Sequence, residues 1–256
     1  MLIRLMAGSR KSTTFLSLGL LGCIMPQGAW ATEVERPAGD RGVSEILVTA
    51  QRRQEVAGNV PVTIQILDGE RLAVAHVTDM TGVAALVPGL TMARSLRGPP
   101  IFTLRGIGFN SQNMSATSPV GFYLDEVALP YPVMTDGALF DLERIEVLKG
   151  PQGILFGRNT TGGLVNSIAR KPGRATEGYL TLSGGGYESY GAQGALAGPL
   201  TSTLAARLAF SIERADKGWQ TSISRGDRLG RRNKAAARIG LLWEPEDGTR
   251  LLLTGT

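Results

Sequence analysis

The segment from Leu204 to Glu213 alternates strictly between two kinds of side chain, and this pattern constrains the fold more than any other. Apolar residues such as Leu208 and Ile212 recur at every second position, with small or polar residues such as Arg207 between them. A period of two residues is that of a β-strand and excludes an amphipathic helix. Similar stretches follow Pro172, separated by turns, and they predict further strands at 179–183, 187–197, 236–243 and 250–255.

These strands have one apolar face and one small or polar face, which is typical of transmembrane β-barrels. Aromatic residues near strand ends, among them Tyr190 and Trp243, would suit the interfacial girdles of such a barrel. A soluble antiparallel sheet alternates in the same way. The pattern therefore predicts an antiparallel sheet and leaves both environments open.

Residues 55–172 have a different, mixed pattern. Short β-prone runs are separated by glycine-rich turns, and helices are expected to begin near Asp68 and near Thr78 or Asp79. A segment of roughly 110 residues can bury a small core, so we predict an independent α+β domain. The expected strands lie at 62–67, 90–93, 102–105, 120–124, 144–148 and 164–168.

The N-terminus has the three parts of a secretory signal peptide. A basic start is followed by the apolar run 13–24 and by the small-residue site Ala29-Trp30-Ala31. The run is too short to span a bilayer as a helix. We predict that residues 1–31 are a signal peptide cleaved after Ala31, which exports the chain to the cell envelope. Lipidation at Cys23 is a weaker alternative.

Charge and composition exclude several functions. Three of the 27 basic residues lie in the signal segment, so the mature chain is close to neutral and nucleic acid is not an expected partner. One histidine and one cysteine cannot build a metal site of those residues. The sequence has no G-x-S-x-G or H-E-x-x-H motif and no P-loop. We therefore expect no enzyme activity, no catalytic residues, no bound metal and no cofactor.

Residues 45–50 form a β-prone island within the polar tail 32–54. A strand-like segment on a tail is expected to lack a sheet of its own, so its exposed backbone groups invite pairing with another protein. The alternative is an ordinary edge strand of the following domain.

Five blocks, in this order, resemble the TonB-dependent outer-membrane receptor family. They comprise a TonB box, the opening of the plug domain, a helix-to-strand turn, an Arg-Gly strand end and the C-terminal plug signature. The blocks are 45–53, 60–72, 86–90, 103–108 and 140–172. Glu126 stands where the family usually has glycine, which puts that turn in doubt, and Ser167 and Ala169 replace the larger apolar or hydroxyl residues common there.

The resemblance implies an α+β plug domain followed by the start of an antiparallel transmembrane β-barrel. About five strands are expected here of the roughly 22 in this class of plugged barrel, so these strands alone would not close. The implied organisation is a signal peptide at 1–31, a flexible tail with the box at 32–54, the plug at 55–172 and an incomplete barrel at 173–256.

The resemblance also implies a function and partners. It suggests an outer-membrane receptor for energy-coupled uptake of a scarce nutrient, most often a ferric siderophore or another iron complex. The implied partners are the TonB energy-coupling protein of the inner membrane, outer-membrane lipid and the iron-chelate ligand. The alternative is a periplasmic plug-like binding module that forms no pore, or a truncated, non-functional receptor.

Three groups of site residues follow. The residues expected to bind the TonB partner are Glu45, Ile46, Leu47, Val48, Thr49 and Ala50. Those expected to form plug–barrel ion pairs are Arg105, Glu143, Arg144, Glu146 and Arg158. Those expected to contact substrate at the plug apices are Phe109, Asn110, Gln112 and Asn113.

Overall fold

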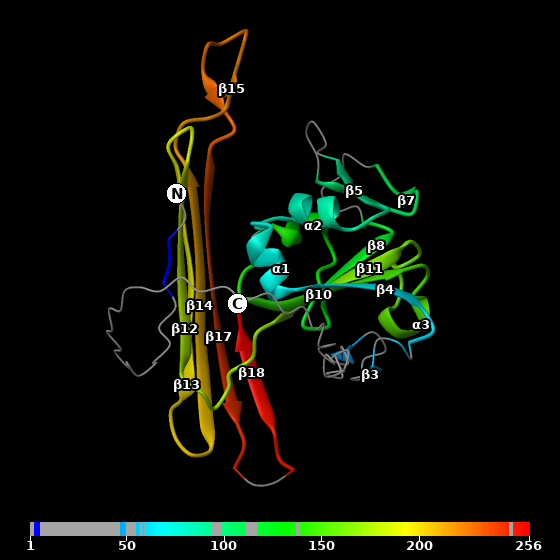
Figure 1. The fold of residues 1–256 in the computed structure, drawn as a ribbon. Coiled ribbons are helices and arrows are strands. Elements are labelled where there is room, and N and C mark those ends of the chain that lie inside the picture. The colour runs from blue at the N-terminus through cyan, green and yellow to red at the C-terminus, as the bar shows by residue number, and fades with distance from the viewer. Residues whose placement is uncertain are drawn as a thin grey trace, which may run out of the picture.

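The computed structural model contains an α+β domain and, beside it, a sheet of long strands (Figure 1). Both units lie within the residues that the structure describes, which are 3–5, 47–49, 55–56, 58, 60–93, 99–110, 117–136, 139–245 and 248–256. The predicted box residues Glu45, Ile46 and Ala50 and the predicted apex residues Gln112 and Asn113 lie outside them.

The α+β domain is built on a five-stranded mixed sheet. Its central strands, β10 (Leu142–Lys149) and β11 (Gly163–Ala169), are mostly or wholly buried, as expected for a sheet covered on both faces. Strand β8 (Val120–Leu124) runs parallel to β11, and every other pair is antiparallel. The order is β4 (Thr63–Asp68), β10 (Leu142–Lys149), β11 (Gly163–Ala169), β8 (Val120–Leu124) and β9 (Val127–Ala128).

Two short helices begin at the predicted caps. The side chain of Asp68 accepts a hydrogen bond from the backbone N–H of Arg71 at the start of α1 (Gly69–Val74). Asp79 accepts from the N–H groups of Thr81 and Gly82 at the start of α2 (Met80–Leu86). An aspartate at this position satisfies donors that the helix itself leaves unpaired.

The sheet divides the core of the domain into two apolar clusters. The larger cluster contains residues of α1 and α2 and includes Leu67, Leu72, Val83, Ile145, Val147 and Val165. The smaller cluster contains Val48, Val60, Tyr123, Leu148, Phe156 and Leu164. Strand β10 contributes to both clusters because successive side chains of a strand point to opposite faces.

Short elements complete the domain. Strand β2 (Leu47–Val48) pairs with β3 (Glu55–Val56). A separate three-stranded sheet contains β5 (Leu90–Ala93), β6 (Ile101–Leu104) and β7 (Ile107–Gly108). The remaining elements are the 3₁₀ turn η2 (Pro132–Thr135) and the one-turn helix α3 (Gly153–Phe156).

The turn that Glu126 put in doubt is formed. Asp125 and Glu126 are the two central residues of the β8–β9 hairpin, with φ of 48° and 68°. Two positive φ angles in a two-residue loop are those of a type I′ turn, in which glycine is favoured but not required. The N–H of Glu126 donates to Oδ1 of Asn166 at 3.3 Å, which helps to hold the turn without glycine.

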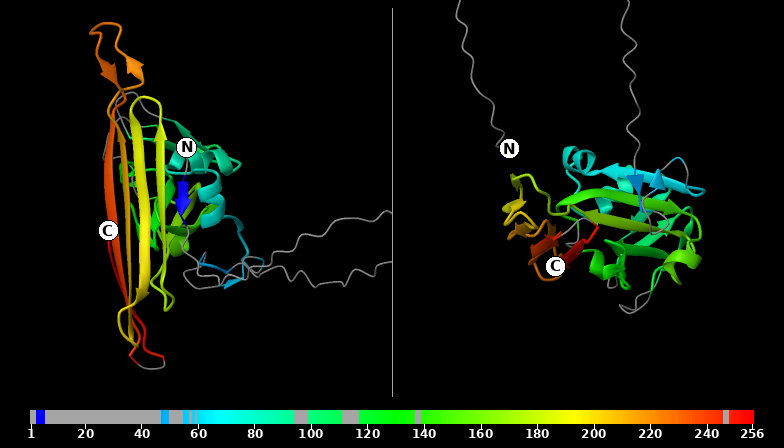
Figure 2. Two further views of the ribbon diagram at one scale, coloured as in Figure 1. Left: turned by 60° about the vertical axis from the view of Figure 1, so that its left-hand side comes forward. Right: turned by 90° about the horizontal axis from the view of Figure 1, so that it is seen from below.

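The five predicted long strands are present in one antiparallel sheet, here called the long-strand sheet. They are β12 (Glu177–Gly185), β13 (Ser189–Pro199), β14 (Leu204–Ala215), β17 (Arg232–Trp243) and β18 (Leu251–Gly255), in this order. Between the predicted strands 204–213 and 236–243 the structure contains a short hairpin of β15 (Gln220–Thr221) and β16 (Arg228–Leu229), and β17 begins before the predicted strand, at Arg232. Figure 2 shows the sheet as an open slab along one side of the domain.

The two faces of this sheet differ as the alternation predicts. On the face toward the domain, Ala195 and Ala209 are buried against Phe140. On the other face Leu196, Leu208 and Ile239 lie opposite one another in register and are 65%, 55% and 51% exposed. The sheet therefore presents a continuous apolar surface away from the domain.

A sixth strand, β1 (Ile3–Leu5), pairs antiparallel with the edge of β12. These residues belong to the segment that we predict to be a cleaved signal peptide, and the pairing shows that the edge of β12 accepts a strand. Within the described ranges, no helix has the length and apolarity needed to cross a membrane.

Candidate functional site

Glu146 is a charged residue at the centre of the sheet. Its neighbours Ile145 and Val147 point into the larger cluster, so the alternation turns Glu146 to the opposite face. It lies in register between Ile66 of β4 and Asn166 of β11, and its side chain is 0% exposed. A carboxylate in such a place is costly unless hydrogen bonds satisfy it.

The N-terminal segment supplies these hydrogen bonds. The backbone N–H of Thr49 donates to both oxygens of Glu146, at 2.9 and 3.2 Å, and its hydroxyl donates to Oε2 at 3.1 Å. Nδ2 of Asn166 donates to the Thr49 hydroxyl oxygen at 3.3 Å, and Nε of Arg144 donates to Oε1 of Glu146 at 2.8 Å. We call Glu146, Asn166 and Arg144 the clasp.

Val48 extends this attachment into the apolar core. It is 0% exposed and packs in the smaller cluster with Leu148 and Tyr123. Leu47 and Val48 pair with Val56 and Glu55. The expectation that this segment has no sheet of its own is therefore wrong for Leu47–Val48, which pair with β3. The segment also fits the face of β10 and β11, because the apolar side chain of Val48 packs in the smaller cluster and the two donors of Thr49 bind Glu146.

The residues predicted for plug–barrel ion pairs lie elsewhere. Arg144 pairs with Glu146 and with Glu143, all on β10, while Arg105 and Arg158 are exposed. Among the described residues, the ion pairs of Glu143, Arg144 and Glu146 stay within β10 and do not reach the long-strand sheet.

The buried ion pair that joins the two units was missed from the sequence. Arg207 of β14 donates two hydrogen bonds to Asp141, from Nε at 2.7 Å and from Nη2 at 2.6 Å. Its Nη1 donates to Glu177 of β12 at 2.7 Å. The side chains of Arg207 and Asp141 are 5% and 1% exposed. A bidentate pair shielded from water is the strongest form of this interaction.

A second arginine of the same face holds the chain before Asp141. Nη1 of Arg238, on β17, donates to the carbonyl of Phe140 at 3.0 Å, and its guanidinium lies 4.4 Å from the centre of the Phe140 ring. In the sequence, the signal that could have identified this contact is an arginine at an inward-facing position of an alternating strand that is otherwise rich in alanine.

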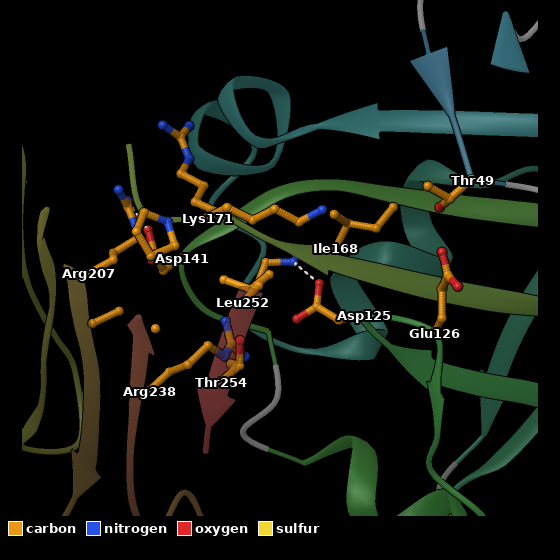
Figure 3. Close-up of a pocket in the computed structure, with 15 residues that line it drawn as sticks. Thr49, Asp125, Glu126, Asp141, Ile168, Lys171, Arg207, Arg238, Leu252 and Thr254 are labelled. Atoms are coloured by element: carbon orange, nitrogen blue, oxygen red, sulfur yellow. Dashed lines mark hydrogen bonds and ion pairs between the residues drawn. The ribbon is translucent and has the colours of Figure 1, made fainter. Parts of the chain in front are cut away.

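A cavity of about 280 Å³ lies at the junction of the two units. Figure 3 shows Asp125 within it, with Asp141 and Arg207 on one side and Glu126 and Thr49 on the other. Burial raises the pKa of Asp125, although a hydrogen bond from the N–H of Ala169 at 3.0 Å opposes this. The described residues contain no cluster of three metal-ligating side chains.

The predicted substrate-contacting residues lie in the segment that follows β7. Phe109 and Asn110 are exposed, and Phe109 is 59% accessible. This end of the domain lies away from β3, at the top of the view in Figure 1.

Comparison with known proteins agrees with this fold. A profile described as "TonB-dependent Receptor Plug Domain" matches residues 57–164. The pesticin receptor of Yersinia enterocolitica is 27% identical over 241 residues, which cover 93% of this chain and 34% of that receptor. The ferric-pyoverdine 358 receptor of Pseudomonas putida is 26% identical over 174 residues, 68% of this chain and 21% of that receptor.

A solved structure shows the same fold. The ferric yersiniabactin uptake receptor FyuA from Yersinia pestis superposes with a TM-score of 0.71 at 24% identity, over 81% of this chain and 33% of that one. The chain thus spans about a third of the length of the pesticin receptor, and the proteins matched are receptors rather than enzymes. Residues 57–164 therefore form a plug domain of the TonB-dependent receptor family, followed in this chain by antiparallel strands that match the start of a receptor barrel.

Proposed function

We propose that this chain is the N-terminal portion of a TonB-dependent outer-membrane receptor that takes up a ferric siderophore or a similar iron complex. The observation that carries the proposal is the long-strand sheet, which packs small residues and two arginines against the plug and presents leucines such as Leu196 and Leu208 on its other face. Exposed apolar side chains on one face of antiparallel strands suit lipid contact.

The class of ligand rests on the relatives. The names of two of them specify ferric yersiniabactin and ferric pyoverdine. We infer an iron chelate for this chain, bound on the side of the plug that carries Phe109 and Asn110.

The coupling partner would bind residues 45–50 by adding a strand. Because such pairing uses backbone donors and acceptors, the sensitive change is one that removes a donor. We expect Leu47→Pro, made in the full-length receptor, to abolish energised uptake of the radiolabelled iron chelate while cells still bind it at the surface. Leu47→Val, which keeps the N–H, should retain a large part of the uptake. Equal uptake by the proline variant and the parent would refute the assignment.

The location is tested separately. We expect the protein in the outer-membrane fraction, with an N-terminus at Thr32 if cleavage follows Ala31. Recovery of a soluble protein from the periplasm would instead favour the free plug-like module.

A further inference from the structure

Arg214 places a charge on the apolar outer face of the long-strand sheet. Alternation along β14 puts it on the same side as Leu208 and Ile212, and all three residues are exposed. Under the proposed function this face meets lipid, and an arginine among acyl chains is costly. The guanidinium of Arg214 therefore calls for an anionic group at the membrane surface.

The neighbours of Arg214 place it at the edge of the apolar surface. Its partners in register are Tyr190 of β13 and Asn233 of β17. The guanidinium donates a hydrogen bond to the hydroxyl of Tyr190, which is 48% exposed. Tyrosine is enriched at the level of lipid headgroups, because its ring suits the apolar region and its hydroxyl suits the wet one. This row of residues therefore has the character of a headgroup level.

The hairpin β15–β16 continues beyond this row, at the end of β14 and β17 (Figure 1). It exposes the apolar residues Trp219, Ile223 and Leu229, at 58%, 104% and 41%. Two glycines fix its shape. A Cβ on Gly218 would clash with the carbonyl of Leu229, and one on Gly230 would clash with the indole of Trp219. A shaped hairpin that exposes an indole and aliphatic groups suits a membrane surface.

Some basic residues near this row are already neutralised. Nη1 of Arg232 lies 2.8 Å from Oε1 of Glu213, and Nζ of Lys234 lies 2.7 Å from Oδ1 of Asp136. Glu213 alternates with Arg214 and so lies on the face toward the plug, to which Asp136 belongs. These two cations serve contacts within the chain.

Three other arginines at this end are not neutralised in this way. Among the residues that the structure describes, Arg228 and Arg231 form no ion pair, and Arg214 is attracted by Asp216 without an ion-pair contact. Arg228 and Arg231 are both exposed. Positive charge therefore gathers where the apolar face ends.

The opposite end of the sheet differs. Trp243 is 46% exposed there, on the same outer face as Leu208, but Arg174 and Arg250 both pair with Glu244. The outer face thus has an aromatic residue at each end and unneutralised arginines at the hairpin end. Basic residues without partners are attracted to a membrane surface that carries anionic headgroups.

We propose that Arg214, Arg228 and Arg231, flanked by Tyr190 and Trp219, bind the phosphate groups of a lipid whose acyl chains lie along the apolar outer face. The proposal rests on the proposed function, in which that face meets the membrane. A guanidinium can hold a phosphate by two parallel hydrogen bonds. A lipid is favoured over a soluble phosphate, because the arginines are continuous with the apolar surface and one molecule can contact both.

The experiment measures lipid binding by the full-length receptor purified in detergent. The probe is diphosphoryl lipid A, a glycolipid with two phosphates and several acyl chains, and native mass spectrometry gives the fraction of receptor that retains it. Each basic residue near an anionic lipid surface is worth about fivefold in binding. We expect Arg214→Gln to weaken binding about fivefold, and Arg214→Gln combined with Arg231→Gln about twentyfold.

Two arginines that already have partners serve as matched controls. Arg174 pairs with Glu244 at the opposite end of the sheet, and Arg225 pairs with Asp227 on the hairpin itself. Arg174→Gln and Arg225→Gln should each change lipid binding by less than about twofold. A loss in Arg174→Gln equal to that in Arg214→Gln would refute the site, since binding would then follow total charge and not position.

Competing compounds distinguish the source of the phosphate. Inorganic phosphate should not displace lipid A from the parent, because it offers nothing to the apolar face. Displacement by inorganic phosphate would overturn the assignment to a lipid. Phosphatidylethanolamine, which has no net charge, should bind equally to the parent and to the double variant.

Failure of the site is distinct from failure of the proposed function. Equal retention of lipid A by the parent and the double variant, both recovered from the outer membrane, would refute the site alone. Recovery of the parent as a soluble periplasmic protein would refute both. If the double variant does not reach the outer membrane, the same criteria apply to Arg231→Gln alone, which lies outside the strands and should weaken binding about fivefold.

Discussion

Replacing Arg207 by methionine should loosen the junction between the plug and the long-strand sheet. Methionine has a similar length but no charge, so the change leaves the carboxylate of Asp141 buried without its two charge-assisted hydrogen bonds. Glu177 is about half exposed and can turn to water, so the cost falls mainly on Asp141.

The size of the effect follows from burial. Removing one member of a buried ion pair costs about 3–5 kcal/mol, because the remaining charge is uncompensated. The more exposed pair Arg174–Glu244, whose residues lie just before β12 and just after β17, is a suitable control, with side chains 49% and 30% accessible. Arg174→Met should cost no more than about 1 kcal/mol.

The assay is equilibrium unfolding in urea, followed by circular dichroism of the full chain in detergent. A double-mutant cycle of Arg207→Met and Asp141→Leu isolates the pair. We expect Arg207→Met alone to lower the free energy of unfolding by about 3 kcal/mol or more, and Asp141→Leu to recover much of the loss, since apolar replacement of both partners is often close to neutral. Equal losses for Arg207→Met and Arg174→Met, with no coupling in the cycle, would refute the reasoning.

Three further predictions concern the plug. Burial raises the pKa of Asp125, so ionising it costs stability as the pH rises through its folded pKa. Asp125→Asn should therefore stabilise the chain at pH 7 in urea titrations, and this gain should shrink as the pH is lowered towards 3.8, the ordinary pKa of the carboxyl group. A gain that does not change with pH would contradict this. Gly163 has φ of +132°, and an added Cβ would lie 2.2 Å from the carbonyl oxygen of Leu148, so Gly163→Ala should destabilise the plug strongly while Gly153→Ala, in open space, should not. Leu67→Ala should cost about 2–5 kcal/mol in the same titration, and a loss below 1 kcal/mol would place Leu67 outside the core.

The sequence was sufficient for the strands and helix starts that follow local rules. Alternation at residues 204–213 predicted β14, and the same pattern placed the other long strands within a few residues. Asp68 predicted the start of α1, and the choice between Thr78 and Asp79 predicted that of α2, where Asp79 is the cap, because capping depends only on the next three residues.

Contacts between distant residues could not be predicted in this way. Thr49 and Glu146 are 97 residues apart, and Asp141 and Arg207 are 66 apart. Glu146 alternates with Ile145 and Val147 in the strand 144–148, so the pattern places it on the face opposite to these apolar residues. The pattern does not indicate that this face is buried or which group covers it, because a period of two fixes the face of a strand and not what packs on it.

Under the proposed function, in which the coupling protein pulls on the N-terminal segment, the two buried carboxylates also order the events. Asp141 directly precedes β10 and is fixed to β14 by Arg207, while Glu146 lies in the middle of β10 and holds Thr49. Strand β10 is paired along most of its length with β4 and β11, whereas the segment 47–49 is held by a two-residue ladder, one apolar side chain and the clasp. Tension on the segment therefore meets its weakest attachment at Thr49. The clasp should open while β10 and the ion pair that joins the plug to the long-strand sheet remain intact, so the first step of coupling would free the segment without unfolding the plug.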